Sequence, residues 1–499
     1  MPESKTKTLQ RSRIQKASRN GTGDELVLGK VPTGIRGLDQ VTHGGFPRGR
    51  TALVCGGPGA GKTLLGLEFL VRGATVFNEP GVCFAFEETG EELATNVASL
   101  GYDLPSLIRS KKLAVEYVHV ERKLIEETGE YDLEALFIRL KQAIESINAK
   151  RVLLDTIELL FMGLTNEGIV RSELRRLFHW LKDQGVTAVI TAEVGERTLT
   201  RYGLEEYVAD CVIMLDHRVN EQISTRRLRV VKYRGSAHGT NEYPFLVDEN
   251  GISVIPITSL GLTHGASTER VSSGTAGLDR MLGGKGFYRG SSILISGTAG
   301  TGKSSYCAAF TNAACARGEK ALYFAFEESP TQILRNMSSV GIDLHKWMNR
   351  KLLYINASRP TMTGLEAHLA IMYKDVEEFR PSVVVVDPIT NLISVGDLYA
   401  VKAMLTRLID FLKLKSITAM FTNLVYGDEP EERAIGISSL MDSWLVLRDV
   451  QHGAERIRTV NLLKSRGMAH DSRVHSFALS DKGIAINGDY QTISATPIH

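Results

Sequence analysis

Short apolar runs alternate along this chain with longer segments whose apolar residues recur every three or four positions. The runs at 51–55, 81–86 and 151–154 are almost uninterrupted, which predicts strands buried on both faces. The segments at 91–100 and 133–147 show helical spacing instead. Strands that alternate with helices form a parallel sheet covered on both faces, so we expect an α/β fold.

The pattern changes after a further helix at 170–183 and a core strand at 186–191. The segments 211–215 and 226–232 alternate at short range, which predicts strands that pair without a crossover helix. Strands joined in this way run antiparallel. We therefore expect a mostly parallel central sheet, with helices on both faces and an antiparallel end.

The whole pattern occurs twice. The segment 33–39 is matched by 273–279, and the residues F-A-F-E-E at 84–88 recur unchanged at 324–328. A repeat of this size indicates the duplication of one domain. We divide the chain into a basic, disordered tail 1–25, a first domain 26–256, a linker 257–270, a second domain 271–486 and a short tail 487–499.

Each half contains the pattern G-x-x-x-x-G-K-[ST] between a buried strand and a helix, at 56–63 and 297–304. Glycines let several backbone N–H groups converge on phosphate oxygens, and the positive end of the following helix adds to the field. The lysine supplies a charge for the outer phosphates. We expect two ATP sites in tandem P-loop NTPase domains. Their loop residues are Gly57, Pro58, Gly59, Ala60, Gly61, Lys62, Thr63 and Leu64, and Thr298, Ala299, Gly300, Thr301, Gly302, Lys303, Ser304 and Ser305.

An aspartate ends one apolar run in each half, at Asp155 and Asp387. A carboxylate at this place in P-loop NTPases holds Mg²⁺ together with the loop hydroxyl, which is Thr63 or Ser304 here. The alternative is a turn or a helix cap, but two aspartates in register with two phosphate loops favour the metal. We also count Glu327 among the candidate ligands of Mg²⁺.

Two adjacent carboxylates follow another strand in each half: Glu87-Glu88 and Glu327-Glu328. We expect this strand to lie beside the loop strand, with the carboxylates at its carboxyl end, where ligands bind. One carboxylate there can deprotonate a water or a hydroxyl next to the γ-phosphate. The alternative is a solvated pair that caps the next helix. We favour Glu87 and Glu327 as bases, supported by Glu88 and Glu328.

The element K-x-R-G-x-x-H appears at 232–238 and at 464–470. Its cations lie far in sequence from their own phosphate loops, which suits basic residues that reach a nucleotide on a neighbouring subunit. An exposed basic strand is the simpler alternative. With Arg458, the candidate nucleotide contacts here are Lys232, Tyr233, Arg234, Ser236 and His238, and Lys464, Ser465, Arg466, Met468 and His470.

Charge and composition restrict the partners. The formal net charge is +2, and no apolar run approaches the length of about 18 residues that a membrane span needs. We therefore expect neither a nucleic-acid nor a membrane partner. The five cysteines show no metal-binding spacing and indicate a reducing compartment, so we expect a cytoplasmic protein.

These residues together resemble the KaiC family of double-domain, RecA-like ATPases. The resemblance covers about 26–486 and includes H-G-G at 43–45, R-Y-G-x-E-E at 201–206, and both copies of the phosphate loop, F-E-E and K-x-R-G. It implies a homohexamer built as a two-tiered ring, with ATP between subunits. It further implies a slow ATPase in the first domain, and an autokinase and autophosphatase in the second.

The resemblance also implies roles for particular residues. Ser438 and Ser439 stand at the two phosphorylated hydroxyls of the family. Glu327 becomes the base for the serine hydroxyl, and Glu87 the base for water. Ser99 and Leu100 fall where members of the family contact the nucleotide, so the resemblance adds them to the candidate nucleotide-binding residues.

The sequence departs from the clock members of the family at three places. Arg433 replaces a threonine of the phosphate cycle, Ser394 replaces an arginine, and the sequence ends at His499 without the long extension that clock members present to KaiA. We therefore do not expect a KaiA-like partner, whereas a KaiB-like partner is compatible with the first ring. Either a circadian-clock-like or a stress-signalling timer fits.

Two other functions remain as alternatives. A RecA- or DnaB-like DNA-dependent ATPase needs a basic channel and loops whose aromatic residues stack on bases. The small net charge of the chain argues against it. A nucleotide-gated scaffold without kinase activity would need only the two phosphate loops.

Overall fold

The computed structural model describes residues 28–118, 134–161, 166–195, 199–200, 203, 208–220, 223–256, 265–425, 437–452 and 455–489. Five sequence predictions lie wholly or largely outside these ranges: the N-terminal basic tail, the linker 257–270, the C-terminal tail 487–499, the substitution at Arg433 and most of the R-Y-G-x-E-E element.

A nine-stranded mixed sheet forms the centre of the first domain, in the order β11-β10-β9-β8-β3-β7-β6-β4-β5. The strands from β8 to β5 in this order are parallel, and β8 to β11 pair antiparallel, as the sequence predicted. The strands are β3 (Thr51–Gly56), β4 (Gly81–Ala85), β5 (Leu113–Tyr117), β6 (Arg151–Asp155), β7 (Thr187–Glu193), β8 (Cys211–Asn220), β9 (Ile223–Tyr233), β10 (Glu242–Asp248) and β11 (Gly251–Val254).

Helices cover both faces of this sheet. Successive residues of a strand point to opposite faces, so one strand contributes side chains to the cores on both sides. Val54 of the loop strand lies in one core with helices α3, α4 and α5, whereas Leu53 lies in a second core with α7 and α8. The helices are α2 (Leu38–Val41), α3 (Lys62–Val76), α4 (Gly90–Ala98), α5 (Leu104–Arg109), α7 (Glu134–Ile147) and α8 (Glu167–Asp183), with the 3-10 helix η1 (Ile157–Phe161) after β6.

The second domain repeats this architecture, in the order β16-β15-β17-β18-β14-β19-β20-β21-β22. Its strands are β14 (Ser292–Gly297), β15 (Ala321–Ala325), β16 (Leu353–Ala357), β17 (Val383–Asp387), β18 (Thr418–Leu424), β19 (Ser443–His452), β20 (Glu455–Ser465), β21 (His475–Ser480) and β22 (Gly483–Asp489). Its helices are α10 (Ala276–Met281), α11 (Lys303–Ala316), α12 (Pro330–Ser339), α13 (His345–Asn349), α14 (Leu365–Phe379) and α15 (Leu398–Leu414), with η3 (Pro360–Met362) and η4 (Ile389–Val395).

A short two-stranded ribbon precedes the main sheet in each domain. It consists of β1 (Lys30–Val31) with β2 (Phe46–Pro47) in the first domain, and of β12 (Arg270–Val271) with β13 (Phe287–Tyr288) in the second. The strand β12 begins one residue inside the predicted linker, and β22 runs three residues past the predicted end of the second domain.

One sequence prediction about the sheet is wrong. We expected Glu87 and Glu327 to follow the strand beside the loop strand, but β3 pairs with β7 and β8, whereas β4 pairs with β5 and β6. The same holds for β14 and β15 in the second domain. The reason is that two strands from later in the chain enter the sheet between them. The carboxylates still lie at the carboxyl edge of the sheet.

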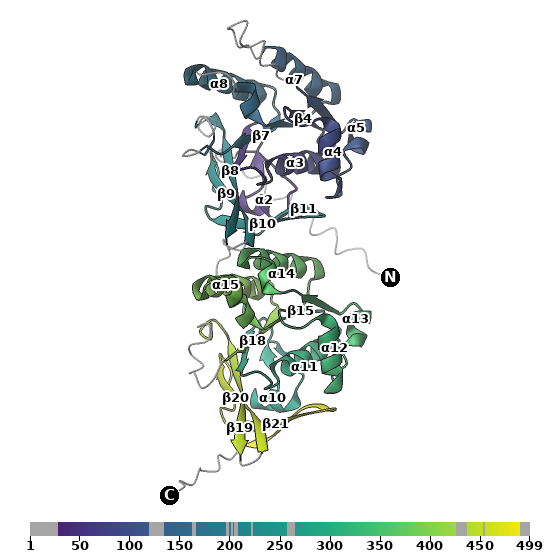
Figure 1. Ribbon diagram of the computed structural model, residues 1–499, viewed down its shortest axis with the longest axis vertical. Coiled ribbons are helices and arrows are strands. Elements are labelled where there is room, and N and C mark those ends of the chain that lie inside the picture. Colours follow the sequence, from purple (N-terminus) through teal and green to yellow (C-terminus); the bar gives the residue numbers. More distant parts are fainter. Residues whose placement is uncertain are drawn as a thin grey trace, which may run out of the picture.

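The two domains meet where the second-domain helix α14 packs against β10 of the first domain (Figure 1). Ion pairs join them: Arg227 to Glu366 at 2.7 Å and Lys374 to Asp248 at 2.9 Å. Ile255 of the first domain is buried in the core that contains α14. Among the described residues, no helix is both long and apolar enough to cross a bilayer.

Candidate nucleotide sites

Both phosphate loops adopt the turn that their glycines permit. In the first loop, Gly59 and Gly61 have φ angles of 70° and 100°, in the left-handed region that residues with a Cβ rarely adopt. Helix α3 begins directly afterwards, so its positive end faces the loop. The Lys62 ammonium donates hydrogen bonds to the carbonyl oxygens of Gly56 at 2.9 Å and Gly57 at 3.1 Å.

The second loop repeats this geometry. Gly300 and Gly302 have φ angles of 81° and 97°, and the Lys303 ammonium donates to the carbonyl oxygens of Gly297 at 2.9 Å and Thr298 at 2.8 Å. Burial lowers the pKa of Lys303, and the nearby carboxylates of the site oppose that shift. A lysine held in this way is available to anionic oxygens that enter the loop.

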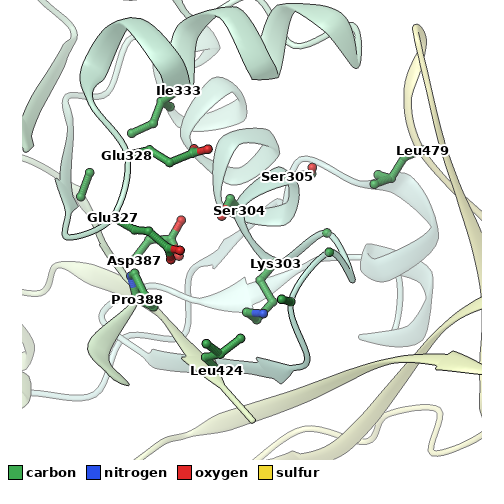
Figure 2. A pocket seen from close by; sticks show the side chains of 14 residues that line it. Lys303, Ser304, Ser305, Glu327, Glu328, Ile333, Asp387, Pro388, Leu424 and Leu479 are labelled. Atoms are coloured by element: carbon green, nitrogen blue, oxygen red, sulfur yellow. The ribbon is translucent and has the colours of Figure 1, made fainter. Parts of the chain in front are cut away.

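A cavity of about 330 Å³ adjoins the second loop. Figure 2 shows Glu327 and Asp387 pointing into it toward Lys303, so the structure brings together the predicted loop, base and metal carboxylate. Its lining consists of Ala299, Gly300, Gly302, Lys303, Ser304, Ser305, Ala325, Glu327, Glu328, Ile333, Asp387, Pro388, Leu424 and Leu479.

Each candidate metal carboxylate accepts a hydrogen bond from a threonine on the neighbouring strand. Thr191 donates to Asp155, and Thr422 donates to Asp387. Burial raises the pKa of Asp155, and the hydrogen bonds from Thr191 and Thr63 oppose this shift. These threonines were missed by the sequence reasoning, although their recurrence one strand away in both halves could have revealed them.

The donor atoms near each loop suit Mg²⁺. A carboxylate and a loop hydroxyl are hard oxygen ligands, and Mg²⁺ in nucleotide sites completes its shell with water and phosphate oxygens. Across the described ranges, no group of three or more His, Cys, Asp or Glu side chains could hold a metal ion alone.

The paired carboxylates Glu87-Glu88 and Glu327-Glu328 do not cap the helix that follows them. This argues against the alternative that they are only a solvated pair at a helix end. Thr89 is the N-cap of α4 and forms a capping box with Glu92, and Ser329 and Gln332 do the same for α12. Glu88 instead accepts a hydrogen bond from the side-chain amide of Asn96, on the helix that follows it. Burial raises the pKa of Glu88, and the nearby Asp155 adds to this shift.

The predicted phosphoacceptors contact the predicted cations of the same chain. The Lys464 ammonium donates to the carbonyl oxygen of Ser438 at 3.0 Å, and the Arg466 guanidinium donates to that of Ser439 at 2.6 Å. The lining of the 330 Å³ cavity includes none of these four residues. The structure therefore joins acceptors and cations to each other, away from the phosphate loop of their own chain.

Strand order explains this separation. The strand β20, which carries Lys464, lies two places from the loop strand β14 on one side, and the strand β15, which precedes Glu327, lies three places away on the other. Lys232 and the catalytic candidate Glu87 are separated by the same order in the first domain. The cations and the carboxylates of one chain therefore lie on strands at opposite sides of the loop strand.

Several predicted nucleotide residues serve the local fold. The Tyr233 hydroxyl donates to the carbonyl oxygen of Gly45 at 2.7 Å, and the Tyr233 ring stacks on His238 with centroids 6.3 Å apart. Ser236 accepts a hydrogen bond from Lys30 at 2.6 Å. In the first domain, the structure joins neither these residues nor Ser99 and Leu100, at the end of α4, to the loop. In the second, the cavity lining omits Arg458, Ser465, Met468 and His470.

The fold and the two loops define a tandem P-loop ATPase. The family profile described as "ATPase: KaiC" matches residues 31–259 and again 271–491. The chain is 54% identical over 478 residues to the circadian clock protein KaiC2 of Synechocystis sp., covering 94% of this chain and 84% of that protein. It is 37% identical to the circadian clock oscillator protein KaiC of Thermostichus vulcanus, with 94% and 92% coverage. The chain belongs to the KaiC family of ATPases, which confirms the resemblance.

The match with the KaiC of Synechococcus elongatus is similar, at 36% identity over 494 residues, with 96% of this chain and 94% of that protein covered. Because the two profile matches together span most of the described chain, both halves are ATPase domains of this family, and ATP is their ligand.

Proposed function

We propose that the first domain hydrolyses ATP slowly, and that the second transfers the γ-phosphate of ATP to Ser438 or Ser439 of a neighbouring copy. The contacts of Lys464 and Arg466 with the acceptor turn carry this proposal. They support an acceptor that travels with its own cations toward the cavity of another subunit. Cations beside the acceptor would offset charge on the transferring phosphate.

In the second domain, Glu327 takes the proton of the serine hydroxyl as its oxygen forms a bond to the γ-phosphorus. The bond from that phosphorus to the β–γ bridging oxygen breaks, and ADP leaves. In the first domain, Glu87 takes the proton of an attacking water in the same way. Bound Mg²⁺, held by Asp387 with Ser304 or by Asp155 with Thr63, would neutralise phosphate charge. Glu327 is a further candidate ligand.

Transfer between copies requires an assembly, and we propose a homohexamer with two tiers and a nucleotide at each subunit interface. Membership of the KaiC family supports it, as does the separation of acceptor and cavity within one chain. A phosphate adds about −1.5 to −2 charges, enough to change packing at such an interface. The protein would then act as a timer, in a circadian or a stress response, with a KaiB-like protein as a candidate partner of the first tier.

The five cysteines are all buried, which suits a reducing compartment, and we propose the cytoplasm. Neither a nucleic acid nor a membrane is part of the proposal.

Incubation with Mg·ATP, followed by intact mass and peptide mapping, tests the kinase. We expect one or two phosphates on the peptide that contains Ser438 and Ser439, and none there in Glu327→Gln. ATP hydrolysis without any phosphate on the protein would contradict the kinase and leave the ATPase. The matched variant Glu87→Gln should keep the phosphate and lose most of the hydrolysis.

A further inference from the structure

The two metal carboxylates differ in what surrounds them. Asp387 accepts a hydrogen bond on each of its two oxygens, because the Thr422 hydroxyl donates to Oδ1 and the Tyr323 hydroxyl donates to Oδ2. Asp155 accepts its hydrogen bonds from threonines alone, from Thr191 on Oδ1 and from Thr63 of the loop. Within the described part of the chain, no hydrogen bond connects Asp155 with Cys83, the first-domain residue that corresponds to Tyr323.

Strand register explains how Tyr323 reaches the carboxylate. In the second domain, Tyr323 pairs with Val385, and Ala325 pairs with Asp387. Tyr323 is therefore the diagonal neighbour of Asp387 on the same face of the sheet, within reach of a long aromatic side chain. The ring is 1% exposed, so its position is fixed by packing.

The same diagonal exists in the first domain but holds a shorter side chain. Ala85 pairs with Asp155, which makes Cys83 the diagonal neighbour. Cys83 is fully buried. A thiol is a weak donor, whereas a phenol is protonated at neutral pH and donates a strong hydrogen bond to a carboxylate. The two sites therefore differ in the kind of donor: a buried phenol supports the carboxylate of the second site, and threonine hydroxyls support that of the first.

We propose that Tyr323 is a positioning residue of the second site, which fixes the orientation of the Asp387 carboxylate for the divalent ion that accompanies ATP. The inference rests on the proposed function, since it gives Asp387 the role of a metal ligand. Partners of a ligating carboxylate orient it, and their loss commonly weakens metal binding 10- to 100-fold. The first site reaches its affinity without such a phenol.

The experiment follows Mn²⁺, which carboxylates bind much as they bind Mg²⁺, by electron paramagnetic resonance. The full chain is titrated with Mn²⁺ in the presence of a non-hydrolysable ATP analogue. Two bound ions per chain are expected, and the ion lost in Ser304→Ala identifies the second site. Tyr323→Phe keeps the ring and removes only the hydroxyl. It should weaken Mn²⁺ at the second site about 10-fold and leave the first unchanged.

Two controls separate positioning from general stability. Cys83→Ala should leave both ions at their wild-type affinity. In Tyr323→Phe, the metal-free affinity for the analogue should stay at the wild-type value, which a merely structural role would lower. Thr422→Val, which removes the other donor to Asp387, should weaken the same ion by a similar factor and serves if Tyr323→Phe does not fold.

Two results would overturn the inference: Mn²⁺ affinity at the second site within twofold of wild type in Tyr323→Phe, or equal weakening at both sites. If the wild-type second site binds no Mn²⁺ with the analogue, the proposed function of that domain fails as well. The wild-type titration therefore distinguishes the two failures.

Discussion

The phosphate loops of the two domains have the same geometry, but the side chains packed between the loop helix and the sheet differ. In the first domain, Arg151 is completely buried in β6, the strand that ends at Asp155, and it donates to Glu79 at 2.8 Å and to the Phe69 carbonyl oxygen at 2.9 Å. Val383 takes this place in the second domain. The residues of the loop are constrained because they must bind phosphate. The residues packed between the sheet and the loop helix need only fill the space and satisfy their buried polar atoms.

The loop helix has adapted to this difference. Gly73 of α3 leaves room for the buried arginine, because a Cβ there would come within 2.4 Å of Arg151 Cδ. The corresponding residue of α11 is Ala314, which faces the smaller Val383. A larger side chain on the strand is thus matched by a smaller one on the helix.

A second buried charge is also confined to the first domain. Glu68 of α3 is fully buried and accepts hydrogen bonds from the Ile252 backbone N–H at 2.7 Å and from Arg72 at 3.2 Å. Alanines stand at the corresponding positions of α11, Ala309 and Ala313. We therefore expect the removal of a buried charged side chain, Arg151 or Glu68, to change the stability of the first domain.

The largest effect is expected when either of the two proposed bases, Glu87 or Glu327, is replaced by glutamine. Glu87→Gln should slow ATP hydrolysis by the first domain about 10²- to 10⁴-fold, and Glu327→Gln should slow serine phosphorylation by a similar factor, since a glutamine cannot accept the proton. Phosphate release and phosphopeptide formation are measured on the same samples. If either substitution reduced both rates equally, the division of labour between the domains would be wrong.

Removal of the buried arginine should produce the next largest effect. Arg151→Met should destabilise the first domain by about 3–5 kcal/mol, because Glu79 and the carbonyl oxygens of Phe69 and Pro32 lose their partner. Val383→Ala in the second domain should cost about 1–3 kcal/mol. Both free-energy changes are measured by denaturant unfolding that is monitored through the hydrogen exchange of β6 and β17.

The glycine gives this prediction a matched control. Gly73→Ala alone should be destabilising, but it should cost less in the Arg151→Met background, because the atoms that its Cβ would meet are gone. Strictly additive effects would contradict the pairing of Gly73 with Arg151.

Substitution of the loop lysines should weaken the affinity for ATP by about 10- to 100-fold at the altered site alone, the size expected for a charged hydrogen-bond partner. Lys62→Ala and Lys303→Ala are compared by calorimetric titration, and their assembly by size-exclusion chromatography with Mg·ATP. We expect Lys62→Ala to impair assembly more. Equal hexamer content in both variants would argue against a special role of the first tier.

The smallest effect concerns pH. Burial raises the pKa of Glu68 above its usual value, so the folded first domain favours the protonated form. The resulting stability is fully present below about pH 4.5 and is lost as pH rises through the raised pKa. Glu68→Gln should flatten this dependence, with a change on the order of 1 kcal/mol. The exposed Glu91→Gln should leave the profile of first-domain unfolding unchanged.

The sequence predicted the parts of each site that are local in the chain. The loop, its lysine and the aspartate at the end of β6 or β17 follow from short motifs next to apolar runs, and the repeat strengthened each of them. The error over the strand before Glu87 has a physical cause. Strand order depends on β6 and β7, which enter the sheet some 70 to 110 residues later, and no local pattern encodes that insertion.

Contacts across strands escaped prediction for a related reason. Whether Tyr323 reaches Asp387 depends on the register between β15 and β17, which are separated by about 60 residues. A repeat points to the residues that its two halves share, whereas Tyr323 and Cys83 are informative because they differ. The contact between Lys464 and Ser438 likewise joins two segments whose proximity only the folded sheet reveals.

Mixing of subunits tests most directly the claim that a cavity of one chain serves the acceptor of another. Glu327→Gln chains, which keep the acceptor serines, are combined with Ser438→Ala/Ser439→Ala chains, which keep the base, and Mg·ATP is added. We predict phosphate on Ser438 or Ser439 of the Glu327→Gln chains in the mixture, and on neither variant alone. An unphosphorylated mixture of properly assembled chains would contradict the account.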